Sequence, residues 1–211
     1  MHFVNIPGMP RRLCVQSANL LSAARIALTP AFVAAVWCAP RLAGLGWVAG
    51  ILFVAIAASD VFDGRLARRY GSASSGGRAL DHLADIGFIL CALGTYTVQG
   101  LTPWWVPAAV GGAFGFYVMD SWAQRARAVP RLIGSRVGHL GGICNYSLVG
   151  LLAFNNIAGL HLLPPGLLAN LFWLVPLYST ASVVSRVLAW RLPCPMTAAG
   201  RPCAHCEGTR L

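Results

Sequence analysis

Six apolar stretches, each about as long as a bilayer-crossing helix, are the feature that most constrains how this chain can fold. A transmembrane helix needs about 20 consecutive, mainly apolar residues. The stretches are residues 19–39, 45–64, 79–98, 104–122, 139–160 and 167–188. Charged residues make up only 10% of the chain, against about 25% in soluble domains. We therefore predict an all-α, polytopic membrane protein whose six transmembrane helices form one bundle.

The six stretches leave room for a single domain and two short ends. We expect an N-terminal segment at residues 1–18, a six-span domain at 19–188 and a tail at 189–211. The tail contains Cys203, His205 and Cys206, and a Cys-x-x-Cys pair is a common zinc half-site. The second half-site is missing, so the tail is interpreted either as a metal-binding segment or as a frayed terminus.

The distribution of arginine predicts how the bundle is oriented. All 16 basic residues are arginine. Apart from Arg25 inside the first stretch, they lie before the first stretch, between the second and third, between the fourth and fifth, and at or after the end of the sixth, whereas only Arg41 lies on the opposite side. The positive-inside rule then places both termini in the cytosol. Topology and anionic lipid headgroups account for the net charge of +10, so no nucleic-acid partner is expected.

Four of the six acidic residues lie between residues 60 and 85. Asp60 and Asp63 are three residues apart at the end of the second stretch, and Asp81 and Asp85 are four apart at the start of the third. Each spacing puts a pair on one helix face. Because the two stretches run in opposite directions and a short loop at 65–78 joins them, both pairs should reach the same membrane depth and face each other.

Carboxylates so close to hydrocarbon need a compensating cation. Oxygen-only ligands suit a hard divalent ion such as Mg²⁺ or Mn²⁺, which favours a metal site for phosphate chemistry. Gly64 and Gly77 would let a ligand approach the backbone closely, and the planar fork of Arg68 suits phosphate oxygens. The alternative is a set of helix-end ion pairs with the neighbouring arginines.

The spacing of these residues resembles the signature of the CDP-alcohol phosphatidyltransferase family, D-x-x-D-G-x-x-A-R-x8-G-x3-D-x3-D. Its fixed positions are occupied by Asp60, Asp63, Gly64, Ala67, Arg68, Gly77, Asp81 and Asp85. The segment 19–30, with Arg25, is similar to the first helix of these enzymes and most similar to that of phosphatidylglycerophosphate synthases. The resemblance covers residues 19–188.

The resemblance implies an enzyme that cleaves the pyrophosphate of a CDP-linked lipid such as CDP-diacylglycerol, transfers the phosphatidyl group to an alcohol and releases CMP. It implies a two-metal site for Mg²⁺ or Mn²⁺ formed by the four aspartates, with Asp85 as the general base. It also implies that Gly64, Ala67, Arg68 and Gly77 hold the cytidine diphosphate. The expected setting is the cytosolic face of a bacterial inner membrane, and homodimers are typical of the family.

The acceptor alcohol is predicted from charge. Arg131, Arg136 and His139, with Arg125 and Arg127, gather between the fourth and fifth stretches. Arginine forks suit a phosphate monoester, so we expect a phosphorylated polyol, with glycerol 3-phosphate first. Positive-inside bias explains the same cluster equally well, and inositol phosphate, phosphatidylglycerol and serine remain alternative acceptors.

A six-span transporter is the main competing class, because transporters also carry acidic residues in membrane helices. It would not explain why these residues are confined to one edge, and no inverted repeat is evident in the sequence. An intramembrane aspartyl protease would need its two aspartates deeper in the spans. We therefore favour the transferase.

Overall fold

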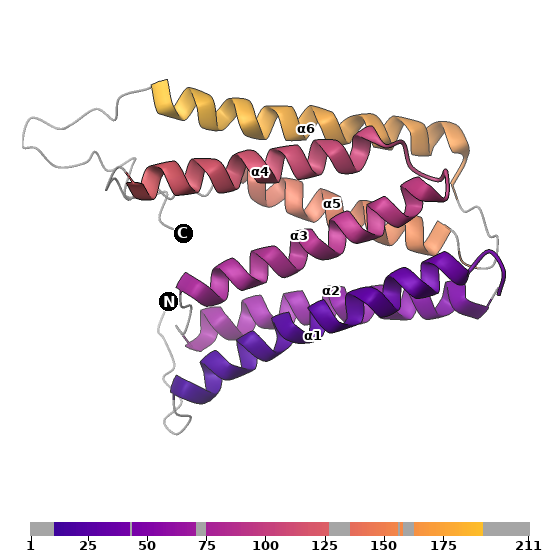
Figure 1. Cartoon of the computed structure of the whole chain (residues 1–211), viewed down its shortest axis with the longest axis horizontal. Coiled ribbons are helices and arrows are strands. Elements are labelled where there is room, and N and C mark those ends of the chain that lie inside the picture. The colour runs from indigo at the N-terminus through magenta and orange to yellow at the C-terminus, as the bar shows by residue number, and fades with distance from the viewer. Residues whose placement is uncertain are drawn as a thin grey trace, which may run out of the picture. The chain divides into compact units, whose positions relative to one another are not determined.

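The computed structural model describes the backbone of residues 11–42, 44–70, 75–126, 136–155, 157 and 163–191, and the side chains of 22–42, 44–60, 80–121, 140–155, 157 and 163–188. Within these residues the chain forms six helices and no strands (Figure 1), so the all-α prediction is confirmed. The helices are α1 (Arg11–Cys38), α2 (Gly44–Tyr70), α3 (Ser75–Val98), α4 (Trp105–Ala126), α5 (Arg136–Asn155) and α6 (Pro165–Arg191).

Each helix contains or overlaps one predicted stretch, but several helices continue past its polar end. Helix α2 runs on to Tyr70 and α3 already begins at Ser75. The loop predicted over 65–78 is therefore wrong for 65–70 and 75–78, which are helical. Over 65–70, hydropathy ends the span where arginines begin, whereas Arg, Leu and Ala are among the strongest helix formers and let the helix continue. Residues 75–78 are Ser-Gly-Gly-Arg, a composition typical of loops, yet they form the first turn of α3.

Length and hydropathy single out one described helix that could cross a bilayer, the segment Pro165–Leu188 of α6. Three shorter apolar segments, Ser22–Cys38, Gly44–Asp60 and Leu140–Asn155, belong to α1, α2 and α5. The arrangement of six spans with cytosolic termini stays a prediction.

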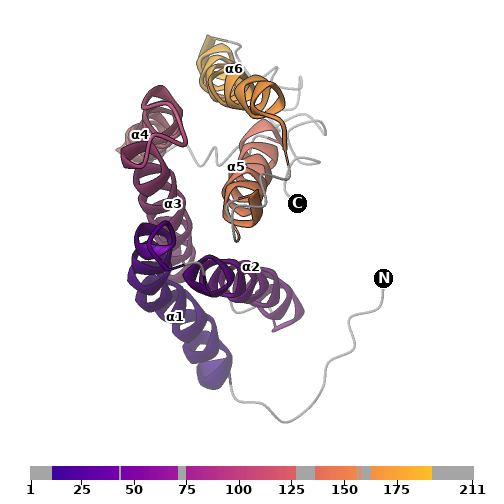
Figure 2. The same ribbon diagram turned by 90° about the vertical axis from the view of Figure 1, so that its right-hand side faces the viewer.

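Helices α1, α2 and α3, together with residues 149–164, belong to one compact unit. Helix α1 packs against both α2 and α3, as Figures 1 and 2 show. Aromatic rings join the three helices: Phe32 of α1 meets Phe88 of α3 edge-on at 5.2 Å between centroids, and Phe53 of α2 lies 6.4 Å from Phe88. Phe32 and Phe88 are almost completely buried. This aromatic core fixes how the three helices sit against one another.

Gly150 lets Phe53 pack closely against the end of α5. A Cβ atom at position 150 would lie 2.5 Å from the Phe53 ring, a distance that real Cβ atoms essentially never show. The same ring reaches Phe154, one turn further along α5, at 6.2 Å between centroids. A side chain at position 150 would therefore force the Phe53 ring to move, whereas glycine leaves room for it.

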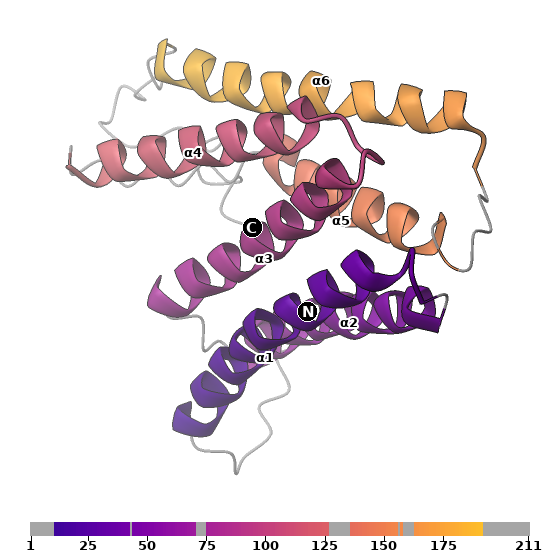
Figure 3. The same cartoon turned by 45° about the vertical axis from the view of Figure 1, so that its right-hand side comes forward.

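Helices α4 and α6, with residues 136–148 of α5, belong to the second compact unit. Figure 3 shows α4 and α6 running side by side, and they pack against each other. Asp120 of α4, which is 3% exposed, accepts a hydrogen bond of 3.2 Å from Arg186 of α6. The Arg186 guanidinium also lies over the ring of Tyr117, 4.6 Å from its centroid. A buried charge is tolerated when it is paired in this way.

Candidate functional site

Helices α1 and α2 each carry a charged residue on the same face as their buried apolar residues. On α1, Arg25 lies two turns before the buried Phe32, and both side chains are completely buried. On α2, Asp60 lies one turn after Ile56, whose side chain is also completely buried. Positions four or seven residues apart share a helix face. The packing that buries Phe32 and Ile56 therefore also turns Arg25 and Asp60 inward.

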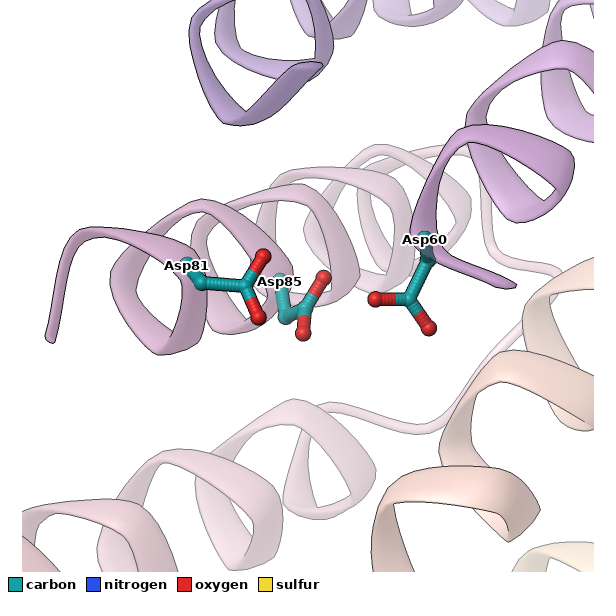
Figure 4. Close-up of side chains that lie close together, drawn as sticks. All are labelled: Asp60, Asp81 and Asp85. Atoms are coloured by element: carbon teal, nitrogen blue, oxygen red, sulfur yellow. The ribbon is translucent and has the colours of Figure 1, made fainter. Parts of the chain in front are cut away.

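Helix α3 supplies two more carboxylates by the same rule. Asp81 and Asp85 are one turn apart, and the buried Ala84 and Phe88 lie on the adjoining face. Figure 4 shows the carboxylate of Asp60, from α2, turned toward those of Asp81 and Asp85. One carboxylate oxygen from each residue lies within 4.8 Å of the other two. Two helices thus deliver three carboxylates to one place.

Arg25 is the cation at the centre of this cluster. Its Nη1 donates to Oδ1 of Asp81 at 3.1 Å and to Oδ1 of Asp85, and its Nη2 donates to Oδ1 of Asp60 at 3.3 Å. The hydroxyl of Ser22, one turn earlier on α1, donates to the same oxygen of Asp81 at 3.3 Å. One guanidinium therefore bridges α1 to both α2 and α3.

The described residues of the cluster carry charges of both signs. Three ionised carboxylates and one guanidinium give these four residues a formal charge of −2. The carboxylate side chains of Asp60, Asp81 and Asp85 are 38%, 35% and 22% exposed, while that of Arg25 is 0% exposed. The guanidinium is thus buried, whereas the carboxylates are partly exposed. Clustered carboxylate oxygens are the donor set that Mg²⁺ and Mn²⁺ prefer, so these residues fit a divalent cation.

The structure brings together three of the four predicted metal-site aspartates. The fourth, Asp63, lies in α2, but its side chain is outside the described residues. The same holds for the predicted nucleotide-binding residues, Gly64, Ala67 and Arg68 in α2 and Gly77 in α3, and for the predicted acceptor residues Arg136 and His139 in α5. Arg131 and the tail residues Cys203, His205 and Cys206 lie wholly outside them.

Sequence reasoning did not place Arg25 or Ser22 in the site. The available signal was a single arginine inside an otherwise apolar stretch, and an ionisable residue in a membrane helix is expected to have a partner. The expectation that α2 and α3 face each other across a short loop also left out α1. In the structure α1 packs against both helices and supplies the cation between their carboxylates.

An apolar groove of about 370 Å³ lies elsewhere in the same unit, between α2 and the end of α5. It is lined by Trp47, Gly50, Ile51, Val54, Ala55, Ala58, Phe154 and Ile157. Ile51 and Asp60 are nine residues apart, which at 3.6 residues per turn puts them on opposite faces of α2. The groove therefore faces away from the carboxylates and is separate from the site.

The class that the fold and site define is a protein whose described residues are helical and whose helices α2 and α3 bring together carboxylates that could hold a divalent cation. A comparison with protein-family models narrows this class. The model of the CDP-alcohol phosphatidyltransferase family matches residues 15–191, which include all of the helices α2 to α6 and most of α1. The chain belongs to the CDP-alcohol phosphatidyltransferase family.

Two curated relatives illustrate the range within the family. A protein of Mycobacterium tuberculosis named "Probable phosphatidylglycerophosphate synthase" is 34% identical over 99 residues, covering 44% of this chain and 45% of the relative. A "Cardiolipin synthase (CMP-forming)" of Streptomyces coelicolor is 39% identical over 93 residues, covering 42% of this chain and 41% of the relative. The aligned part is therefore less than half the length of each of these relatives.

Proposed function

We propose that the chain transfers a phosphatidyl group from CDP-diacylglycerol, or a related CDP-lipid, to an acceptor alcohol and releases CMP. The observation that carries this proposal is the family match over residues 15–191, which includes a site where Asp60, Asp81 and Asp85 meet. Two relatives named as synthases support the same reaction class.

In the proposed reaction the acceptor hydroxyl oxygen attacks the phosphorus that carries the diacylglycerol. A new P–O bond forms, the P–O bond to the CMP moiety breaks, and CMP leaves with the electron pair of that bond. Asp85 takes the proton of the attacking hydroxyl, because its carboxylate borders Asp81 one turn away and a base must lie within hydrogen-bond reach of the proton it removes. The proposed base would thus lie one turn from a proposed metal ligand on the same helix.

Asp60, Asp63 and Asp81 are the proposed ligands of the divalent metals. When bound, Mg²⁺ or Mn²⁺ would neutralise the pyrophosphate and stabilise the charge of the leaving CMP. The cytidine diphosphate would be held by Gly64, Ala67, Arg68 and Gly77, because these residues match the family signature at the positions with that role. Arg68 would contribute a planar fork for phosphate oxygens.

Glycerol 3-phosphate is the proposed acceptor. Arg131, Arg136 and His139 lie in a segment rich in arginine, and guanidinium groups suit a phosphate monoester. The likeness to a phosphatidylglycerophosphate synthase points the same way. The likeness to a CMP-forming cardiolipin synthase supports phosphatidylglycerol as the second candidate, since that acceptor also carries a phosphate beside its free hydroxyls.

An acceptor panel tests this proposal. Purified protein in detergent is incubated with CDP-diacylglycerol, Mn²⁺ and either glycerol 3-phosphate, phosphatidylglycerol, inositol phosphate or serine, and lipid products are identified by mass spectrometry. We expect phosphatidylglycerophosphate as the main product. Arg136→Ala should raise KM for glycerol 3-phosphate and leave that for CDP-diacylglycerol nearly unchanged. Faster transfer to phosphatidylglycerol would assign the chain to cardiolipin synthesis instead.

The proposed setting is a bacterial inner membrane, with six spans, both termini cytosolic and the carboxylate site at the cytosolic edge. The arginine asymmetry supports this orientation. A diacyl substrate can then enter sideways from the lipid. Assembly as a homodimer, as in other members of the family, is part of the same proposal.

A further inference from the structure

We propose that Arg25 is a resident counter-cation of the carboxylate site, which holds Asp60, Asp81 and Asp85 together before metal binds and competes with the metal for the carboxylates of Asp60 and Asp81. This inference rests on the proposed metal site. It adds a positioning residue from α1, a helix that lies outside the aspartate signature.

The contacts of Arg25 go beyond those of an ordinary helix-to-helix ion pair. Its guanidinium touches one oxygen of each of three carboxylates, two from α3 and one from α2. Arg186, the other arginine with a described ion pair, contacts the single carboxylate of Asp120. A pair of that kind is sufficient to join two helices. Contacts with all three carboxylates give Arg25 the position that a shared cation would take.

Burial strengthens the attraction between the Arg25 guanidinium and the three carboxylates. The Arg25 side chain is completely buried, and charge interactions weaken much less there than at a surface, because solvent screening is lower. Without the guanidinium, three carboxylates would face one another within 4.8 Å and repel. Arg25 therefore stabilises the arrangement of the carboxylates in metal-free protein.

The same contacts predict competition. A divalent cation held by Asp60 and Asp81 would share their carboxylates with the guanidinium, and two positive groups beside the same oxygens repel each other. Metal must then weaken or displace the Arg25 contacts as it binds. Removing the guanidinium should consequently destabilise the metal-free protein but tighten metal binding. If Arg25 were purely structural, its removal would weaken metal binding, because a loosened site binds the metal less well.

The test measures Mn²⁺ binding directly, without substrate and without reading activity. Wild type, Arg25→Met and Arg25→Lys are purified in detergent, free Mn²⁺ is followed by electron paramagnetic resonance, and Tm is recorded in EDTA. We expect Arg25→Met to lower Tm in EDTA and to bind Mn²⁺ at least about tenfold more tightly, about 1.4 kcal/mol. Arg25→Lys keeps the positive charge but loses the planar guanidinium. Its Kd for Mn²⁺ should therefore lie between those of wild type and Arg25→Met, roughly threefold below wild type.

Arg186→Met is the matched control, because it removes a largely buried arginine from an Asp–Arg pair in the other unit. It should lower Tm while leaving the Kd for Mn²⁺ unchanged. If Arg25→Met folds only when Mn²⁺ is present, the metal is replacing the arginine, as proposed. If it folds in neither condition, Arg25→Lys carries the test.

Unchanged or weaker Mn²⁺ binding by a folded Arg25 variant would overturn the inference and leave the metal site standing. Failure of wild type itself to bind Mn²⁺ would overturn the metal site and this inference together. The two failures are therefore distinguishable in one set of titrations.

Discussion

Asp85 is the residue whose role can be separated most sharply from those of its neighbours. Of the three clustered carboxylates its side chain is the least exposed, at 22%, and it lies one turn beyond Asp81 on α3. A general base acts in the transition state, and its loss typically costs about 10²-fold or more in rate. We expect Asp85→Asn to lower kcat by at least that factor while binding of CDP-diacylglycerol largely survives.

Equilibrium binding of a fluorescent CDP-lipid, measured beside turnover, checks this prediction. Asp60→Asn is the comparison, because a lost metal ligand should weaken binding as well as turnover. Equal loss of binding in the two variants would make Asp85 a metal ligand, and the base would have to be another group.

At the scale of helices, the close approach of α5 to α2 depends on one glycine. A Cβ at position 150 would come within 2.5 Å of the Phe53 ring, and overpacking of this kind typically costs about 1–3 kcal/mol. We expect Gly150→Ala to lower Tm. The Phe53 ring also lies 6.4 Å from that of Phe88, between centroids, and Phe88 is on α3 less than one turn from Asp85, so the displaced ring should disturb the site as well.

Gly142→Ala is the control on the same helix, since nothing lies within 4 Å of a Cβ there. Alanine is the better helix former by up to about 1 kcal/mol, so this variant should keep or raise Tm. A similar fall in Tm for both variants would contradict this, because the destabilisation would then come from replacing any glycine of α5 and not from the contact with Phe53.

The elements were largely predictable from the sequence, and the site was predictable in part. Apolar stretches located all six helices, because hydropathy responds to burial or lipid contact. It could not locate the C-terminal end of α2, where arginines continue the helix, or the beginning of α3, where serine and glycines are typical of a loop. The spacing of Asp81 and Asp85 predicted a shared face, since helix periodicity is local. The pairing of Arg25 with carboxylates 35 to 60 residues away depends on tertiary packing, which no local pattern encodes.

For the molecule as a whole, the central prediction is orientation. The positive-inside rule puts the connection at residues 71–74 in the cytosol and that between α3 and α4 outside. In a variant whose seven cysteines are replaced by serine, Leu101→Cys should react with a membrane-impermeant maleimide in intact cells, and Ser74→Cys only after permeabilisation. Leu101 is 40% exposed, so a cysteine there is accessible to the maleimide, and a lack of reaction would mean that it lies on the cytosolic side of the membrane. The reverse pattern would move the carboxylate site to the outer face.

Metal-dependent CMP release tests whether the carboxylate cluster is the metal site of a phosphatidyl transferase. Purified protein receives CDP-diacylglycerol and glycerol 3-phosphate, with Mn²⁺ or with excess EDTA, and CMP is quantified by chromatography. We predict steady CMP release with Mn²⁺, none above background in EDTA, and none from Asp81→Asn protein that melts cooperatively. Full CMP release in excess EDTA, or from folded Asp81→Asn, would contradict the assignment of the carboxylate cluster as the metal site of a phosphatidyl transferase.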